Sequence, residues 1–315
     1  MDDAMHSETD VQREALVGSP PRAAHLRGKA LEALELDPED RVAFARSDRW
    51  IGYPKATEAL RFMDDLLARP RTGSMPCMLL LGRSGNGKST ILKRFTGAHP
   101  PVVRTTGEVT GSVLGMELSP GASETVFWTD LLHACGVAHR DTDSVLRKRT
   151  QAFSVINSLG ARALVIDEFH NILFGAPGAQ RQLLGVLKGL TNLLSVPLIV
   201  TGTEDAIRLI DTDRQLLRRF RHFALPVWRL NDDFRRLLRS FEAVLPLAEP
   251  SGLAGDEIAA TLAHMGDGTI GSLAEILKEA TVLAIRTGRE RIDLGILSKV
   301  APNTAEERKK QASHL

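Results

Sequence analysis

Short apolar runs alternate with helical patterns from about residue 55 to residue 228. The apolar runs are bounded by turn residues, as expected for strands buried on both faces of a sheet. They occupy residues 77–81, 163–166 and 196–201, with a weaker one at 223–227. Apolar positions at helical spacing lie around and between them, at residues 55–68, 89–95, 125–135, 145–158 and 180–194. This alternation predicts a parallel sheet sandwiched by helices, the α/β class.

The pattern changes after Trp228, where helical periodicity alone continues. Four further helices are predicted, at residues 232–245, 255–265, 272–287 and 294–300. We therefore expect an α/β domain at residues 46–228, a small all-α lid domain at 229–301 and a charged tail at 302–315. Residues 1–45 are polar, and Leu31, Leu34 and Leu36 indicate only helical pieces, so we expect an extension there rather than a domain.

Composition and charge narrow the class of protein. A chain of 315 residues suits about two domains, and 43% hydrophobic with 25% charged residues is typical of soluble globular proteins. No apolar run reaches the roughly 18 residues of a membrane span. Residues 1–10 carry no secretory signal pattern, and Cys77 and Cys135 form no disulfide framework or metal motif, so a cytoplasmic location is expected. A net charge of only +1 means that DNA binding would need a local basic surface or an oligomer that repeats one.

A glycine-rich segment follows the first predicted strand. Its residues, Gly82-Arg83-Ser84-Gly85-Asn86-Gly87-Lys88-Ser89, match G-x-x-x-x-G-K-[ST] at every fixed position. Glycines let backbone N–H groups point at phosphates, and the following helix adds its positive end. We expect Lys88 to reach the β- and γ-phosphates of ATP, Ser89 to bind magnesium and Thr90 to lie in the same site. A chance match is the alternative, but the flanking strand and helix favour a phosphate-binding loop.

Two acids end the second apolar run. Asp167 and Glu168 follow residues 164–166, at the strand end where α/β proteins bind ligands. We expect Asp167 to hold magnesium, mostly through water, and Glu168 to orient the attacking water in hydrolysis. An acid pair without catalytic function is the alternative. His170, two residues on, is a candidate for sensing the γ-phosphate or a neighbouring subunit, and a simple capping role is the alternative.

Hydroxyls and arginines supply the remaining candidates. Thr201 and Thr203 lie at the end of the third apolar run, where either could contact the γ-phosphate or the attacking water, with a simple turn as the alternative. Arg218, Arg219 and Arg221 precede the last predicted strand. We favour Arg219 as an arginine that acts on the nucleotide of a neighbouring subunit. The alternative is a solvated basic face at a helix end.

The order of these features resembles that of the AAA+ superfamily of P-loop ATPases. More narrowly, residues 49–291 resemble the TniB and TnsC group of transposition ATPases. The segments that carry this likeness are Asp48-Arg49-Trp50-Ile51-Gly52-Tyr53, Ser84-Gly85-Asn86-Gly87-Lys88-Ser89, Asp167-Glu168-Phe169-His170-Asn171, Gly202-Thr203-Glu204, Leu217-Arg218-Arg219-Phe220 and Gly268-Thr269-Ile270-Gly271-Ser272-Leu273. Because the first segment is where the family contacts the nucleotide base, the resemblance adds Ile51 and Gly52 to the expected nucleotide site.

The resemblance implies an ATP-dependent regulator of DNA transposition. Such proteins form rings or helical filaments on double-stranded DNA with ATP, recruit a transposase, and disassemble upon hydrolysis. The chain departs from many AAA+ proteins at residues 271–274, which lack the second-sensor arginine. Weak coupling between lid and nucleotide, and slow hydrolysis, are therefore expected.

Three other functions remain open from the sequence. One is a different AAA+ DNA machine, such as an initiator or helicase loader, although no winged-helix domain is evident at the C-terminus. The others are a signalling switch without DNA binding and a scaffold that binds ATP with little turnover. Arg140, Arg147, Lys148 and Arg149 form a basic stretch without interleaved aromatic residues, which suggests phosphate contacts, and a solvated helix face is the alternative.

Overall fold

The computed structural model describes residues 23–103, 105, 109–111 and 113–300. The chain divides into two compact units. The first comprises Gly52–Trp228 and Gly268–Ser272, and the second comprises the residues up to Ile51, Arg229–Asp267 and the residues from Leu273 on. The predicted tail at 302–315 lies outside the described residues. None of the described helices has the length and apolar character needed to cross a membrane.

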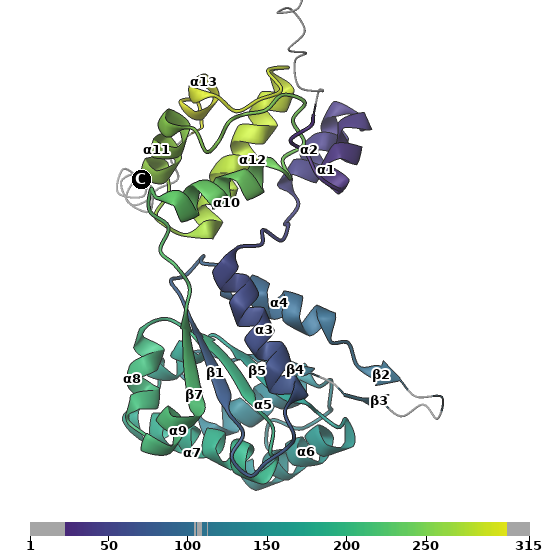
Figure 1. The fold of residues 1–315 in the computed structure, drawn as a ribbon. Helices are drawn as coiled ribbons and strands as arrows, with labels where there is room; N and C mark the ends of the chain where they lie inside the picture. The colour runs from purple at the N-terminus through teal and green to yellow at the C-terminus, as the bar shows by residue number, and fades with distance from the viewer. Residues whose placement is uncertain (1–22, 104, 106–108, 112, 301–315) are drawn as a thin grey trace, which may run out of the picture. The chain divides into compact units, whose positions relative to one another are not determined.

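A five-stranded parallel sheet forms the centre of the first unit (Figure 1). The strands, in their order across the sheet, are β4 (Val113–Glu117), β5 (Ala163–Asp167), β6 (Leu198–Gly202), β1 (Cys77–Leu81) and β7 (Phe220–Ala224). Every residue of β1 and of Leu198–Gly202 is buried, as the continuous apolar runs predict. The predicted parallel sheet is confirmed.

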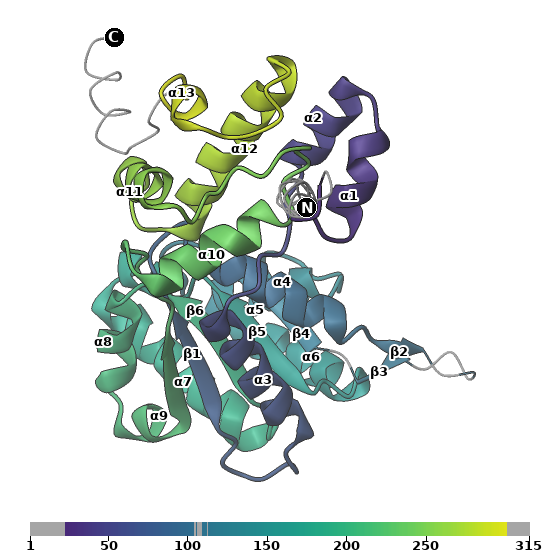
Figure 2. The ribbon, with the colours of Figure 1, turned by 45° about the horizontal axis from the view of Figure 1, so that its top comes forward.

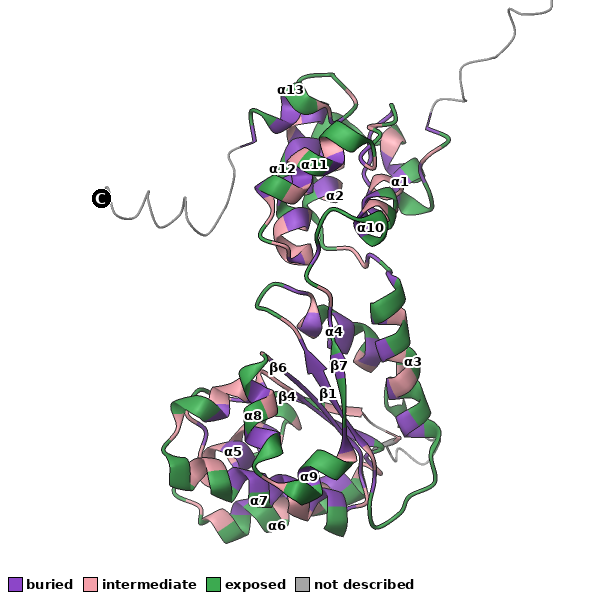
Figure 3. Ribbon diagram, turned by 60° about the vertical axis from the view of Figure 1, so that its left-hand side comes forward, coloured by how far each residue is buried: buried purple, intermediate pink, exposed green. Residues whose placement is uncertain are grey.

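Helices cover both faces of this sheet (Figure 3). Those on one face are α3 (Pro54–Ala68) and α4 (Lys88–Ala98), and those on the other are α5 (Glu124–Ala134), α6 (Val145–Ser158) and α7 (Pro177–Leu193). Alternate strand residues, such as Leu79, Leu164 and Val200, join the hydrophobic core on the α5–α7 side. The sandwich expected from the alternating pattern is therefore confirmed.

Two strands of the sheet differ from the sequence prediction. Strand β4 has no predicted counterpart, because it is an edge strand in which Met116 alone is buried and Gly115 interrupts the apolar pattern. Strand β7 begins at Phe220, three residues before the predicted run. Pro226 cannot extend it, since proline has no N–H for the ladder.

Shorter elements complete the first unit. They are the antiparallel hairpin of β2 (Val102–Val103) and β3 (Val109–Thr110), the 3₁₀-helix η2 (Phe169–Phe174), and the helices α8 (Asp205–Asp211) and α9 (Arg214–Arg219). Helix η2 directly follows the acid pair, and α9 carries two of the three candidate arginines in its last turn. Both segments therefore hold residues that the sequence singled out.

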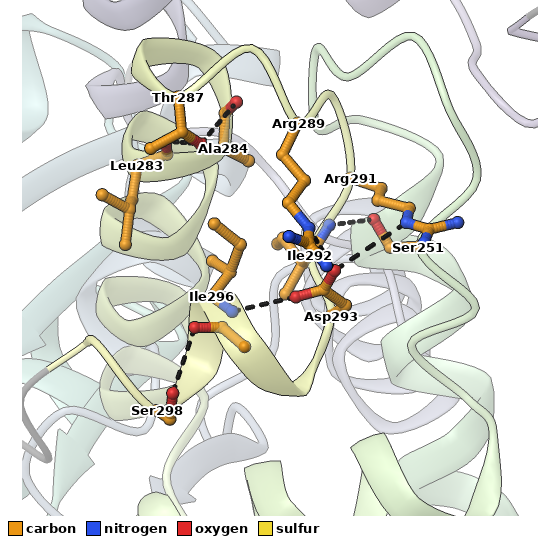
Figure 4. A network of polar contacts seen from close by, with 11 residues as sticks. Ser251, Leu283, Ala284, Thr287, Arg289, Arg291, Ile292, Asp293, Ile296 and Ser298 are labelled. Carbon is orange, nitrogen blue, oxygen red and sulfur yellow. Dashed lines mark hydrogen bonds and ion pairs between the residues drawn. The ribbon is translucent and has the colours of Figure 1, made fainter.

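The second unit is helical (Figure 2). Its elements are α1 (Lys29–Glu32), η1 (Ala33–Glu35), α2 (Pro38–Arg46), α10 (Asp232–Glu242), α11 (Asp256–Met265), α13 (Leu294–Leu297) and most of α12 (Ile270–Arg286). Asp293 caps α13 by accepting from the Ile296 N–H and pairs with Arg289 (Figure 4). The predicted C-terminal helices are thus present.

The N-terminal segment differs from the extension expected for residues 1–45. From residue 23 on it is folded into the helical unit, whereas residues 1–22 lie outside the described residues. The Arg41 guanidinium of α2 pairs with Glu290 and donates to the Pro246 carbonyl, and the Arg27 N–H donates to the Ala243 carbonyl. The segment also has a small apolar cluster of Ala23, Leu26 and Ala30, with Leu34 and Phe44 packed against it. Such short apolar stretches and polar contacts give no long periodic pattern, so the sequence predicted only an extension.

Candidate nucleotide-binding site

The phosphate-loop residues form the turn between β1 and α4. Gly85 and Gly87 have φ angles of 74° and 81°, a left-handed conformation that favours glycine. The Lys88 ammonium turns back into the loop and donates to the Gly82 carbonyl at 3.0 Å and the Arg83 carbonyl at 3.1 Å. Helix α4 begins at Lys88, so its N-terminal end faces the loop. Ser84 and Thr90 are exposed and Ser89 is partly buried.

The environment of Lys88 is set by burial and by two acids. Only 4% of Lys88 is exposed, and burial lowers the pKa of its ammonium. The charges of Glu168 and, to a smaller extent, Asp167 oppose this shift. The structure therefore brings the lysine of the loop and the predicted acid pair into one electrostatic site.

Asp167 and Thr201 meet at the carboxyl ends of neighbouring strands. The Thr201 hydroxyl donates to Asp167 Oδ1, and the Glu168 N–H donates to the same oxygen at 3.0 Å. Glu168 itself has a φ of 56°, so the chain turns sharply as it leaves β5. Because both bonds end on Oδ1, the other carboxylate oxygen of Asp167 is left for a further contact.

The two candidate threonines have different surroundings. Thr201 is fully buried, and its hydroxyl is engaged with Asp167. Thr203 follows the end of β6, is only partly buried, and accepts the Ala206 N–H with its carbonyl as α8 begins. The structure thus places Thr201 beside the acid and leaves the hydroxyl of Thr203 as the more accessible of the two.

The side chain of Asn86 is engaged within its own unit. It is 1% exposed, its Nδ2 donates to the Pro226 carbonyl at 2.9 Å, and its Oδ1 accepts the Ile270 N–H at 3.4 Å. The amide therefore joins three segments of the unit, and only the backbone of Asn86 can face a phosphate. A motif pattern records which residue stands at a position and carries no information on where its side chain turns.

A residue that sequence reasoning missed is Gly271. Its N–H donates to the Gly85 carbonyl at 2.9 Å, and a Cβ at this position would lie 2.6 Å from that oxygen. The segment Gly268–Ser272, here called the lid motif, belongs to the same unit as the phosphate loop and reaches the loop through its backbone, although it lacks the second-sensor arginine. The signal was present in the glycine of the segment Gly268-Thr269-Ile270-Gly271, which carries part of the family resemblance but predicted no contact with the loop.

The three candidate arginines lie around the amino end of β7, at the opposite end of the strands from the phosphate loop. Strand β7 starts at Phe220 beside Cys77, the first residue of β1, whereas the loop follows the last residue of β1. Arg219 is partly buried and donates to Thr191 Oγ1, and the Arg221 guanidinium lies over the Phe62 and Phe223 rings. Arg218 is exposed. None of the three is near the loop of its own chain.

Two further predictions concern residues outside this cluster. Along the chain, Ile51 is the last residue of the helical unit's N-terminal segment and Gly52 is the first residue of the α/β unit, and Tyr53 separates them from α3, which begins at Pro54. In the basic stretch, Lys148 is 2% exposed and donates to Thr129 Oγ1 at 2.9 Å and the Asp141 carbonyl at 3.3 Å. The prediction that Lys148 contacts phosphates, or lies on a solvated face, is wrong because its ammonium is anchored inside the unit.

The sequence of residues 41–230 matches the family described as Bacterial TniB protein. This match spans more than half of the chain. The chain belongs to the TniB family. Within this TniB-family protein, the match includes the phosphate loop, the acid pair, both threonines and the arginines. Among curated proteins, no sequence matches significantly.

Solved structures share the AAA+ fold with this TniB-family chain. The ORC2 protein of Aeropyrum pernix, solved with ADPNP and ADP, has 15% identity and a TM-score of 0.60, with 85% of this chain and 74% of that chain covered. Cdc6p of Pyrobaculum aerophilum has 16% identity and a TM-score of 0.57, with 86% and 73% covered. The ORC1 protein of Aeropyrum pernix in complex with DNA has 20% identity and a TM-score of 0.57, with 87% and 71% covered. At these identities the likeness concerns the fold.

Proposed function

We propose that this protein is an ATP-dependent regulator of DNA transposition. It binds and hydrolyses ATP, oligomerises on DNA and recruits a transposase to the target. The observation that carries the proposal is the match to the TniB family over residues that include a phosphate loop and an acid pair joined in one electrostatic site. The proposed transposase partner rests on the family alone.

The chain's own residues divide the chemistry among them. The backbone of the loop and Lys88 bind the phosphates, since Lys88 can exchange its two carbonyl contacts for the β- and γ-phosphates. Glu168 orients a water whose oxygen forms a bond to the γ-phosphorus. The bond from that phosphorus to the bridging oxygen breaks, and its electron pair leaves with ADP. The proton of the water passes through Glu168 to the phosphate product.

The residues at the loop fit a magnesium ion bound together with the nucleotide. Ser89 offers a hydroxyl in the first turn of α4, and Asp167 has one carboxylate oxygen not used by Thr201 and Glu168. No cluster of three or more acids, histidines or cysteines suited to a metal occurs among the described residues. This donor set suits magnesium, which is held by one or two protein groups, phosphates and water. When bound, the ion would neutralise charge on the phosphates.

The position of the arginines supports hydrolysis that depends on a second copy. They lie at the opposite end of the strands from their own loop, so any nucleotide on which they act must belong to another subunit. DNA binding is supported by a likeness of fold, because a protein of similar fold, ORC1 of Aeropyrum pernix, is solved in complex with DNA. An oligomer would repeat any basic surface of this nearly neutral chain along the phosphate backbone.

Two substitutions test the ATPase function. Glu168→Gln should retain binding of ATP and lose hydrolysis, because the amide keeps the shape of the carboxylate and cannot accept a proton. Lys88→Ala should lose binding of ATP, measured by titration with a fluorescent ATP analogue. Unchanged turnover in Glu168→Gln would contradict the assignment of Glu168, and a parent protein without turnover would favour a scaffold.

Imaging tests the DNA-dependent assembly. The parent protein, mixed with duplex DNA and a non-hydrolysable ATP analogue, should form rings or filaments on the DNA. Lys88→Ala is the matched control and should remain unassembled. A parent protein that stays monomeric with both ligands would exclude the transposition function and favour a signalling switch.

A further inference from the structure

The turn after β5 holds Glu168 in a fixed backbone conformation. Its N–H donates to Asp167 Oδ1 at 3.0 Å and to Thr201 Oγ1 at 3.3 Å, and its carbonyl accepts the Asn171 N–H at 2.9 Å. Asn171 is tied in turn to the segment after β4, since its Nδ2 donates to the Leu118 carbonyl at 2.7 Å. The backbone of Glu168 is therefore anchored on both sides, and only its side chain remains to be positioned.

His170 contacts that side chain from the same turn. Its Nε2 lies 3.1 Å from Glu168 Oε2, and the two side chains are 22% and 30% exposed. A carboxylate oxygen accepts, so the proton of the imidazole in this pair is on Nε2. The other ring nitrogen, Nδ1, is buried without a hydrogen-bond partner among the described residues. The contact with Glu168 is therefore the one polar contact of the ring among the described residues.

The direction of the Glu168 side chain distinguishes two opposite roles for His170. A latch would hold the carboxylate away from the nucleotide, whereas a positioning residue would hold it toward the nucleotide. His170 packs against the end of β6, since a Cβ on Gly202 would lie 3.6 Å from the His170 N and 3.9 Å from its Cβ. The carbonyl of the same Gly202 accepts the N–H of Gly82, the first residue of the phosphate loop, at 3.1 Å. The histidine that holds the Glu168 carboxylate therefore lies beside the start of the phosphate loop, which favours the positioning role.

We propose that His170 is a positioning residue for ATP hydrolysis. It binds Oε2 of Glu168 and so directs Oε1 to the water that attacks the γ-phosphate. Fixing the base in this way raises the turnover number kcat without adding a contact to ATP. The proposal rests on the proposed ATPase function, and it assigns to His170 a role that neither its family match nor its place in the acid motif specifies.

Steady-state hydrolysis by the full chain, with and without duplex DNA, tests this role. His170→Ala should lower kcat by about 10- to 100-fold, since a misplaced catalytic group has an effect of that order. The KM for ATP and the affinity for a non-hydrolysable analogue should change less than about twofold, because no group that binds ATP is removed. His222→Ala is the matched control, since His222 is exposed on β7. It should keep the parent kcat.

Conservative variants separate positioning from folding. His170→Gln retains an N–H donor with similar reach and should restore much of kcat, whereas His170→Asn is too short to reach Glu168 and should not. In a Glu168→Gln background, His170→Ala should cause no further loss of hydrolysis, because the two residues act as one unit. If His170→Ala does not fold, the comparison of the Gln and Asn variants decides.

The possible outcomes test the role of His170 separately from the proposed ATPase function. A rise in kcat in His170→Ala would overturn the proposal and identify a latch. Unchanged kcat in His170→Ala, together with loss of hydrolysis in Glu168→Gln, would overturn the role of His170 and leave the ATPase function standing. Unchanged hydrolysis in Glu168→Gln would contradict the assignment of Glu168 and with it the role of His170, whereas a parent protein without turnover would contradict the ATPase function itself.

Discussion

The three clustered arginines differ in how far their own chain engages them. Arg219, which the sequence favoured as the residue acting across subunits, donates to Thr191, and Arg221 stacks on Phe62 and Phe223. Arg218 is exposed and forms no hydrogen bond or ion pair within the described part of the chain. A guanidinium that acts on another subunit must be able to leave its own surface, so the geometry favours Arg218.

This assignment can be tested by mixing variants. Arg218→Ala should lower DNA-stimulated hydrolysis at least about tenfold with unchanged ATP affinity, because it removes a charge that acts only on a neighbour. Adding inactive Glu168→Gln subunits, which still bind ATP and carry Arg218, should restore part of the activity. Arg219→Ala should instead lower the melting temperature. Restoration of Arg219→Ala but not of Arg218→Ala would reverse the assignment.

Residues of the site differ in how well the sequence predicts them. The sequence correctly predicts that the loop lysine and the acid pair lie close enough to interact. Both follow strands of one parallel sheet, and the carboxyl ends of such strands lie together. The sequence did not predict the side-chain contacts of Asn86 and Lys148, because each depends on which carbonyl the amide or the ammonium reaches in the folded chain. Such partners are set by tertiary packing and leave no periodic signal.

At the scale of elements, the lid motif contacts the phosphate loop where the backbones of Gly271 and Gly85 approach closely. Helix α12 begins in this motif, and Gly271 leaves no room for a side chain against the Gly85 carbonyl. The sequence predicts the helix itself, along with the buried strands, because their periodicity is strong. It did not predict this contact, which joins segments far apart in the chain.

Gly271→Ala tests the importance of the contact. Its Cβ would meet the Gly85 carbonyl at 2.6 Å, so the loop or the helix must shift, and we expect a loss of about 1–3 kcal/mol in the free energy of unfolding. The affinity for ATP should fall as well, because Gly85 belongs to the phosphate loop. Gly189→Ala in α7 is the control, since nothing lies within 4 Å of the added Cβ, and it should be neutral or stabilising. Equal behaviour of both variants in urea unfolding would show that the contact is unimportant.

At the scale of the whole molecule, the N-terminal helices belong to the helical unit through an ion pair that is largely buried. The side chains of Arg41 and Glu290 are 11% and 18% exposed, and Glu290 also accepts the Ala248 N–H. Arg41→Ala removes the guanidinium from beside this largely buried carboxylate. We expect a loss of about 2–4 kcal/mol in the free energy of unfolding.

Urea denaturation of the full chain measures this loss, with Lys55→Ala as the control. Lys55 pairs with Glu58 on an exposed surface, where both side chains are 49% exposed, so its removal should change stability by less than about 0.5 kcal/mol. An Arg41→Ala protein as stable as the parent would show that the N-terminal helices contribute little to this unit.

The left-handed turn at Glu168 has a consequence for the balance between stability and turnover. A glutamate with a φ of 56° is held in a conformation about 1–2 kcal/mol above its preferred one, whereas glycine is unstrained there. Glu168→Gly should therefore raise the melting temperature in calorimetry while it abolishes hydrolysis, with Glu168→Gln as the inactive control that keeps the strain. This pair of results would show a trade-off at residue 168, in which turnover is kept at the expense of heat resistance.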